Sequence, residues 1–180
     1  SLPQGTNKVR AFIPVARIAD MLLNPGTEFR YNGGIHRYPD IKLIYWAGGN
    51  PFHHHQDLAR LARAWQKPET IVVNEPYWTS TARFADVVLP VTTTLERNDI
   101  GFGSHEGVVV AMRQVVKPAG EARNDYDIFT GLARRLGAEA AFTEGRDEMA
   151  WVRTLYDVLV KRAAGMNIAL PDFDRFWEEG

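Results

Sequence analysis

The stretch Lys42-Leu-Ile-Tyr-Trp-Ala-Gly-Gly-Asn-Pro-Phe-His-His-His-Gln56 is the most informative part of this chain. A short apolar run ends at Gly48, Gly49, Asn50 and a proline, and a segment with helical spacing follows. Glycine adopts positive φ without strain and lets a ligand lie against bare backbone, while asparagine offers donors and acceptors. The first N–H groups of a helix attract anions. The stretch therefore predicts a strand, a ligand-facing turn and a helix, with a phosphate-bearing cofactor as the ligand.

An ordinary tight turn is the competing interpretation of Gly48–Asn50, because glycine, asparagine and proline form turns in many settings. Ligands of open α/β sheets, however, bind outside the carboxyl ends of the strands, where this turn falls. The histidines that follow do not suggest a metal site, since neighbouring helix residues point about 100° apart. We expect His53 or His54 to hydrogen-bond a phosphate or ribose. For His55, a capping role in the core is an equal alternative.

Length and composition are those of one globular domain. The chain has 180 residues, 45% of them apolar and 11% aromatic, which is enough to bury one core. The net charge is −1, so the charge does not point to nucleic acid or to an anionic membrane surface. The absence of cysteine excludes disulfides, thiolate metal sites and cysteine nucleophiles in this chain. No apolar run reaches the roughly 20 residues of a membrane helix, so we expect no membrane insertion.

Apolar patterns predict alternating strands and helices. Extended runs are expected at Val9–Ile13, Leu43–Trp46, Ile71–Val73, Val87–Leu89 and Val108–Val116, and helices at Ile18–Leu23, Leu58–Trp65, Thr81–Phe84, Tyr126–Leu136 and Glu148–Ala164. The β-branched run at Thr70–Val73 is typical of a strand buried on both faces of a parallel sheet. Residues 27–40 predict a turn-rich connector, and Val108–Val116 an edge or hairpin strand.

This order predicts an α/β fold: a Rossmann-like open, mostly parallel sheet with flanking helices and a C-terminal helical extension. We expect residues 1–140 to form the dinucleotide-binding core. Residues 141–180 are expected to form the helical extension.

Polar residues also follow the other expected strands. Asn74 and Glu75 come directly after Ile71–Val73, beside the glycine turn if the strands are neighbours, and an acid there suits ribose hydroxyls. A solvated loop carboxylate is the alternative for Glu75. Asp86 is interpreted as a structural acid that pairs with backbone N–H groups or with Arg83.

Two further candidates lie later in the chain. Arg97 is able to fork onto a phosphate or a guanine edge, although Glu96 and Asp99 beside it also fit a surface salt-bridge cluster. Asp125 opens an expected helix, where acids ordinarily cap N–H groups, and its carboxylate also matches the adjacent N–H donors of guanine. The glycine-rich loop Gly101–Gly107 fits neither a P-loop nor the dinucleotide fingerprint. Nucleophile elbows, triads and facing carboxylates are lacking, so no residue here is predicted to be catalytic.

Together with Trp78–Pro90 and Leu95–Ile100, the opening stretch resembles the molybdopterin oxidoreductases of the dimethyl-sulfoxide-reductase family. The similarity is greatest to the branch of biotin sulfoxide, trimethylamine N-oxide and dimethyl sulfoxide reductases, which reduce S-oxides and N-oxides. It runs almost end to end. Further matching segments are Ile13–Arg17, Asn32–Gly34, Asp125–Phe129, Pro171–Asp174 and Trp177.

The resemblance implies a molybdenum bis(molybdopterin guanine dinucleotide) cofactor, shared with other domains of the same polypeptide. It places Gly48–Asn50 against one guanosine dinucleotide arm, Asn74 and Glu75 near the nucleoside, and Asp125 near the guanine. In this branch a serine of another domain binds the metal, and no residue here matches that ligand. The chain begins at Ser1 without methionine, so we expect an interior piece of a larger enzyme, inactive and without cofactor by itself.

A different class of function is the rival hypothesis. The chain would then be a stand-alone nucleotide-binding regulatory module without a redox role, and its surface would be self-contained. An interior domain predicts instead an apolar patch where neighbouring domains dock. A third possibility is a folded scaffold that binds nothing tightly once it is separated from its parent. The resembling enzymes include exported and cytoplasmic members.

Overall fold

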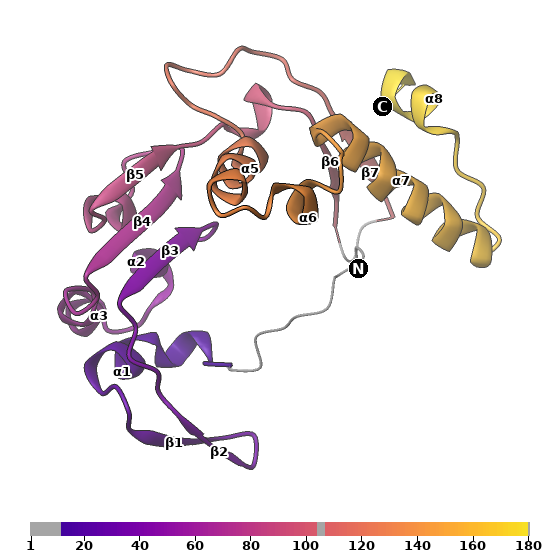
Figure 1. Cartoon of the computed structure of the whole chain (residues 1–180). Helices are drawn as coiled ribbons and strands as arrows, with labels where there is room; N and C mark the ends of the chain where they lie inside the picture. Colours follow the sequence, from indigo (N-terminus) through magenta and orange to yellow (C-terminus); the bar gives the residue numbers. More distant parts are fainter. Residues whose placement is uncertain (1–11, 104–106, 180) are drawn as a thin grey trace. The chain divides into compact units, whose positions relative to one another are not determined.

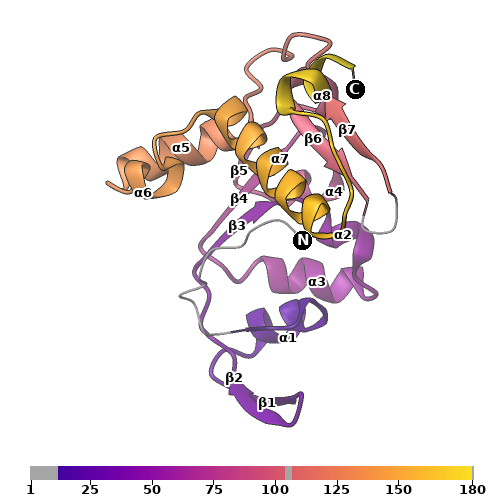
Figure 2. The same cartoon turned by 90° about the vertical axis from the view of Figure 1, so that its right-hand side faces the viewer.

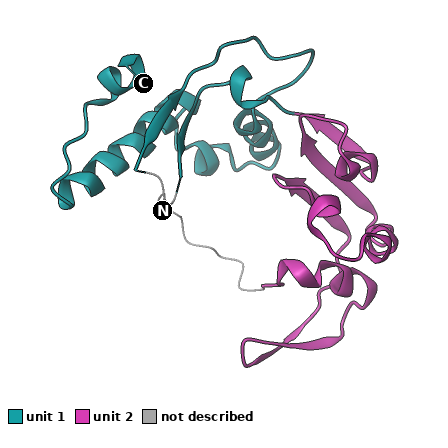
Figure 3. Ribbon diagram, turned by 180° about the vertical axis from the view of Figure 1, so that it is seen from behind, with its two compact units in different colours: residues 1–6, 91–180 teal, residues 7–90 magenta. Residues whose placement is uncertain are grey.

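The computed structural model describes residues 12–103 and 107–179 of the chain, which fall into two compact units (Figures 1 and 3). Unit 2 comprises residues 7–90, and unit 1 comprises residues 1–6 and 91–180. The expected strand at Val9–Ile13 lies outside the described residues up to position 11, and Phe12 and Ile13 are not in a strand. The boundary expected at residue 140 stays a prediction.

Unit 2 contains a three-stranded parallel sheet with flanking helices and a separate hairpin. Its strands are β1 (Glu28–Tyr31), β2 (Gly34–Arg37), β3 (Leu43–Ala47), β4 (Thr70–Glu75) and β5 (Val87–Pro90). Its helices are the 3-10 helix η1 (Val15–Arg17) and the α-helices α1 (Ile18–Leu23), α2 (Pro51–His54), α3 (Leu58–Trp65) and α4 (Ser80–Arg83). The sheet has the order β3-β4-β5, and both neighbouring pairs are parallel. The predicted open α/β fold is confirmed.

The core of unit 2 lies between the sheet and helices α1, α2 and α3. Alternate residues of β3 and β4 point to this side, because side chains along a strand alternate between faces. Ile71 and Val73 of β4 are buried there, and Ile44 and Trp46 of β3 pack against them. From the helices, the cluster takes Ala19, Leu22, Phe52, Leu61, Ala64 and Trp65. Val72, between the two buried residues of β4, is only partly buried.

Residues 27–40 form a structured hairpin, so the prediction of a connector was wrong. Strands β1 and β2 pair antiparallel around Asn32 and Gly33, whose φ angles are 48° and 78°. A two-residue Asn-Gly loop with positive φ at both positions matches the twist of the flanking strands. Phe29 and Tyr38 stack with ring centroids 4.3 Å apart. In Figures 1 and 2 the hairpin projects beyond α1.

Unit 1 combines an antiparallel hairpin with helices. Its elements are the 3-10 helix η2 (Thr94–Glu96), the strands β6 (Asp99–Phe102) and β7 (Val109–Met112), and the helices α5 (Asp125–Arg135), α6 (Glu139–Thr143), α7 (Glu148–Gly165) and α8 (Phe173–Glu179). The pairing of β6 with β7 confirms the hairpin prediction. The hairpin and α8 pack on α7 (Figure 2) around the buried residues Val152, Tyr156, Phe173 and Phe176.

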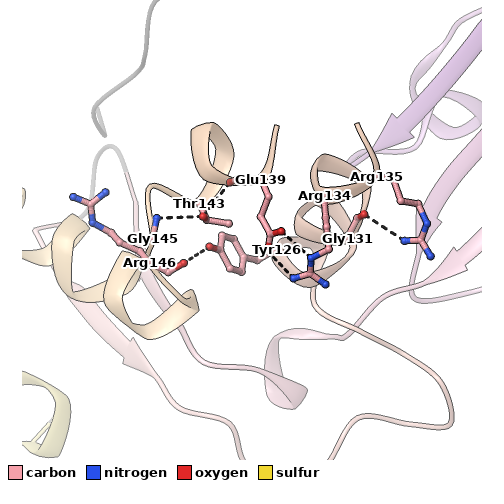
Figure 4. Close-up of polar contacts among 8 residues, drawn as sticks. All are labelled: Tyr126, Gly131, Arg134, Arg135, Glu139, Thr143, Gly145 and Arg146. Atoms are coloured by element: carbon pink, nitrogen blue, oxygen red, sulfur yellow. Dashed lines mark hydrogen bonds and ion pairs between the residues drawn. The ribbon is translucent and has the colours of Figure 1, made fainter. Parts of the chain in front are cut away.

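Polar contacts join α5, α6 and the segment before α7 (Figure 4). Arg134, near the end of α5, donates to both carboxylate oxygens of Glu139 at 2.8 and 2.6 Å. This pairing lowers the pKa of Glu139. The hydroxyl of Tyr126 donates to the carbonyl of Arg146 across 2.5 Å, which joins the start of α5 to the segment before α7. Helices α5 and α7 confirm the two predicted helices, whereas α6 and α8 were not predicted.

Candidate functional site

The carboxyl edge of the parallel sheet is where most of the predicted site residues meet. Ala47 pairs with Asn74 in the β3–β4 register, and Glu75 pairs with Pro90 in the β4–β5 register. Gly48 and Gly49 follow β3 directly, with φ angles of 79° and 69°. A Cβ built on either glycine would have no atom within 4 Å, so the backbone of this turn faces open space.

Hydrogen bonds from neighbouring elements hold the glycine turn in place. The indole Nε1 of Trp46 donates to the carbonyl of Gly49 at 3.2 Å. The hydroxyl of Thr81, a fully buried residue of α4, donates to Oδ1 of Asn50. Asn50 also precedes α2 as its cap residue, although its side chain does not cap the helix. The turn is therefore fixed from both sides, with its glycine backbone exposed.

Asn74 and Glu75 lie at the next strand end, as predicted. Asn74 is buried, and its Oδ1 accepts a hydrogen bond of 2.9 Å from the hydroxyl of Tyr45. Glu75 accepts a hydrogen bond of 3.0 Å from the hydroxyl of Thr79, the cap residue of α4. A pocket of about 250 Å³ opens beside this carboxylate and is lined by Glu75, Pro76, Tyr77, Trp78, Val88 and Pro90.

The histidine run lies on and after the short helix α2. His53 and His54 occupy its last turn and are exposed, so their imidazoles are accessible to a ligand. The Nε2 atom of His55 is buried and has no hydrogen-bond partner within the described residues. Over residues 12–103 and 107–179, no three or more His, Asp or Glu side chains form a group able to hold a metal ion.

The other two candidates, Arg97 and Asp125, belong to unit 1. Arg97 forms an ion pair with Asp99, as the salt-bridge interpretation of that acid expected. Glu96 serves a different purpose, because it accepts hydrogen bonds from the backbone N–H and the hydroxyl of Thr93 at 2.8 and 2.9 Å. The Thr93 bonds lower the pKa of Glu96.

Asp125 is the exposed first residue of α5, and Asn124 occupies the cap position. The Asn124 side chain accepts a hydrogen bond from the Thr92 hydroxyl and donates one to Glu148, both at 2.8 Å. Burial raises the pKa of Glu148, and the negative charge of Asp127 adds to the effect.

Sequence reasoning missed the residues that support the site. Tyr45 and Thr79 donate to the strand-end side chains Asn74 and Glu75, and Thr81 and Trp46 donate to residues of the turn. Tyr45 pairs with Asn74, and Thr81 pairs with Asn50. The partners in each pair are about thirty positions apart in the sequence, so no local pattern predicts the contacts. The capping hydroxyl of Thr79 had a local signal, since it precedes a short helix.

The comparisons with known proteins give the family. The model of the molybdopterin oxidoreductase family matches residues 1–135, three quarters of the chain. The chain belongs to this family. Membership implies a molybdenum–pterin cofactor, which supports the cofactor prediction in its coarse form. Residues 101–107, the glycine-rich loop, fall within the match, but positions 104–106 lie outside the described residues.

Three curated relatives align along nearly the whole chain. A biotin sulfoxide reductase of Cereibacter sphaeroides is 52% identical over 100% of the chain and 24% of its own length. A dimethyl sulfoxide/trimethylamine N-oxide reductase of the same organism is 57% identical over 93% of the chain and 21% of its own length. A trimethylamine-N-oxide reductase of Haemophilus influenzae is 51% identical over 94% of the chain and 21% of its length. The chain thus spans about a quarter or less of these relatives.

A solved structure supports the fold. The acetylene hydratase of Pelobacter acetylenicus superposes with a TM-score of 0.60 over 78% of this chain and 18% of its own. The sequence identity is 22%, so the likeness concerns the fold alone. In the described part of the chain no helix has the length and apolar character needed to cross a membrane.

Proposed function

We propose that this chain is the part of a molybdenum S-oxide or N-oxide reductase that binds one guanosine dinucleotide arm of a bis(molybdopterin guanine dinucleotide) cofactor. The observation that carries the proposal is the open glycine turn at the carboxyl end of β3, directly beside the end of the neighbouring strand β4. Parallel α/β sheets bind their ligands at this edge. The names of the relatives support the reaction class, and other domains of the polypeptide would supply the metal ligand.

The residues at the edge fit the chemical groups of a nucleotide. Gly48 and Gly49 present backbone without a side chain, which permits close approach of a phosphate or ribose. Other glycines of the chain share the positive φ and the open space, so the position of Gly48 and Gly49 at the strand end is the feature that favours a bound group there. The carboxylate of Glu75 beside the pocket is an acceptor suited to ribose hydroxyls.

The remaining candidates take supporting roles in the proposal. His53 and His54 are exposed donors on α2 for a phosphate, and Asn50 and Asn74 are amide side chains at the turn and the strand end. Arg97 and Asp125 of unit 1 are assigned to a phosphate and to the guanine N–H donors, respectively. When bound, the molybdenum–pterin group supplies the two-electron chemistry. This chain contributes binding, and we expect the chain alone to be inactive.

The first test is a titration of the isotopically labelled chain with guanosine monophosphate and, separately, with adenosine monophosphate, followed by backbone amide shifts. We expect shifts with the guanine nucleotide at Gly48, Gly49, Asn50, Asn74 and Glu75. Equal shifts with both nucleotides would contradict guanine selectivity. Shifts at the opposite edge of the sheet would contradict the placement of the site.

A matched pair of glycine variants tests the role of the turn in the cofactor-loaded enzyme. Gly48 and Gly26 both have a φ of 79°, and neither has an atom within 4 Å of a built Cβ, so alanine strains both equally. Only Gly48 lies at the strand ends. We expect Gly48→Ala to lower the guanine nucleotide released per protein on denaturation, and Gly26→Ala to leave it unchanged. If both variants release equally little guanine nucleotide, the loss comes from backbone strain and not from a contact at Gly48.

A further inference from the structure

The tip of the β1–β2 hairpin places an asparagine side chain next to a backbone nitrogen with which it reacts. Asn32 precedes Gly33, and this is the only Asn-Gly pair among the eight asparagines of the chain. The nitrogen of the following residue attacks the side-chain carbonyl carbon of an asparagine, which closes an imide ring and releases ammonia. Glycine in the following position favours this attack, because it has no Cβ beside the nitrogen.

The turn leaves both reacting groups open. Asn32 and Gly33 are exposed, and a Cβ built on Gly33 would have no atom within 4 Å. In the described part of the chain no hydrogen bond engages the Asn32 side chain or the Gly33 N–H. The backbone of Asn32 is left-handed, with a φ of 48°, so it has to rotate before the nitrogen reaches the carbonyl carbon. Neither group has to give up a partner for this rotation.

Most other asparagines that the structure describes lack these features. Asn24 and Asn50 precede prolines, whose nitrogen carries no hydrogen. Asn74 is buried. The side chains of Asn98 and Asn124 accept hydrogen bonds of 2.9 and 2.8 Å. Burial or a bonded side chain holds these three amides away from the geometry of the reaction.

Asn167 is the best match to Asn32 within the chain. It is also exposed and has a positive φ of 58°. Its successor is Ile168, whose branched side chain crowds the nitrogen. The N–H of Ile168 also donates to the carbonyl of Ala163 at 2.9 Å. The comparison therefore isolates two features of Asn32, a glycine neighbour and a free N–H.

We propose that Asn32 is a site of spontaneous modification, where ammonia is lost and water then gives isoaspartate or aspartate. In the first step the Gly33 nitrogen bonds to Cγ of Asn32, the bond from Cγ to Nδ2 breaks, and the N–H proton leaves with the ammonia. In the second step water adds to one imide carbonyl and a C–N bond breaks. Opening at the main-chain carbonyl gives isoaspartate, and opening at the side-chain carbonyl gives aspartate. Water is the only co-reactant.

Isoaspartate alters the hairpin because it adds one carbon to the main chain of a two-residue loop. Such a loop matches the twist of its strands with positive φ at both of its residues. Tyr31 and Gly34 pair directly across the loop. We expect the longer loop to break this pair, whereas Phe29 and Tyr38, which stack 4.3 Å apart, remain packed. Aspartate keeps the normal main chain and suits the same turn.

Ageing of the purified chain at mildly alkaline pH tests the proposal. Methyl transfer by an isoaspartyl methyltransferase measures isoaspartate, and mass spectrometry of the peptides locates it. We expect position 32 to convert at least about tenfold faster than Asn167, since an exposed loop tip opens at little cost. Water enriched in heavy oxygen should leave its oxygen at position 32. Asn32→Gln is the matched control and should accept no methyl group there, because its longer side chain closes the ring poorly.

Three outcomes contradict the proposal. Equal rates at Asn32 and Asn167 mean that the glycine neighbour and the free N–H do not decide the reaction. Conversion at position 32 in denaturant alone means that the folded turn prevents it. A converted residue without heavy oxygen means that the imide is not opened by water.

An Asn32→Asp variant separates the added main-chain carbon from the added charge. Arg30 and Ile35 pair directly in the hairpin, so their amide shifts report its pairing. We expect these shifts to move in the aged chain and to stay close to their original values in freshly prepared Asn32→Asp. Equal movement in both samples assigns the effect to charge and contradicts the role of the added carbon. Unmoved shifts in a fully converted chain contradict the loss of pairing.

Discussion

The two edges of the parallel sheet in unit 2 carry similar polar residues but use them differently. At the amino edge, the backbone N–H of Ile71 donates to the Asp86 carboxylate at 2.8 Å, and the N–H of Asp86 returns a bond of 2.9 Å to the Ile71 carbonyl. Lys42 pairs there with Asp40 at 3.2 Å. These groups satisfy one another and join adjacent segments of the chain.

At the carboxyl edge, side chains from other elements fix the polar groups of the site in position. Thr81 holds Asn50, and Thr79 holds Glu75, while the glycine backbone between the strand ends stays open. Residue type alone therefore does not identify a binding edge. Hydrogen bonds that join two segments of the backbone through one side chain indicate a structural role. Side chains that are fixed in position beside exposed backbone favour a ligand site.

The largest expected effect comes from breaking the amino edge. Asp86→Ala leaves the N–H of the buried residue Ile71 without its acceptor, which we expect to cost about 1–3 kcal/mol of unfolding free energy. Asp86→Asn is the matched control, because its amide oxygen still accepts the bond. Urea unfolding measures the loss, and nucleotide titration should give the same Kd for both variants.

Two outcomes would contradict the structural role of Asp86. A rise in the Kd for guanosine monophosphate in Asp86→Ala, at temperatures where the variant stays folded, would mean that the amino edge also serves the ligand. Full stability in the alanine variant would mean that the bond between Asp86 and Ile71 contributes nothing measurable.

A smaller effect on stability, but a specific effect on binding, is expected at the carboxyl edge. Thr81→Val keeps the volume of a fully buried residue and removes the hydroxyl that holds Asn50. Because Asn50 is only half-buried and water is able to replace the donor, we expect a loss of about 1 kcal/mol in stability. The freed amide should raise the Kd for guanosine monophosphate about fivefold, since 1.4 kcal/mol corresponds to about tenfold.

Thr81→Ser is the control for this prediction, because serine retains the hydroxyl and removes a methyl group. Its Kd should remain close to that of the unchanged protein, even if packing around α4 loosens. If serine and valine raise the Kd equally, the effect is one of packing, and the hydrogen bond to Asn50 has no part in positioning the turn.

Local patterns predicted the sheet because each strand carries its own signal. The apolar run of β3, the β-branched run of β4 and the short run before Pro90 were all placed within about two residues. The β1–β2 hairpin was missed although Asn32-Gly33 is a strong turn signal, because its two strands are only four residues long and contain few apolar side chains.

The side chains that donate hydrogen bonds to the site residues could not be predicted, for a different reason. Thr81 reaches Asn50 and Tyr45 reaches Asn74 only after the strands and helices have packed, and neither pair leaves a periodic pattern in the sequence. In contrast, Asp86 was correctly interpreted as a structural acid, because it directly precedes a strand whose neighbour supplies the N–H. Strand ends are predictable from sequence, whereas the side-chain contacts that fix the residues there are tertiary contacts and leave no local pattern.

The smallest expected effect concerns an ion pair behind the sheet, which serves neither edge. Burial pushes the pKa of Asp20 upward, but hydrogen bonds from Arg60 and Arg17, at 2.5 and 3.1 Å, outweigh it and lower the pKa below 3.8. The unfolded chain therefore binds the proton more readily, so this stabilisation is present above the unfolded pKa and is lost as pH falls through the folded one.

Asp20→Asn should cost less than about 1 kcal/mol at about pH 7 and nothing at about pH 2. Urea unfolding at both pH values measures the gap, with Asp157→Asn as the control for loss of a surface charge. If the stability difference between Asp20→Asn and the unchanged protein persists at about pH 2, the effect comes from packing between α1 and α3 and not from the ion pair.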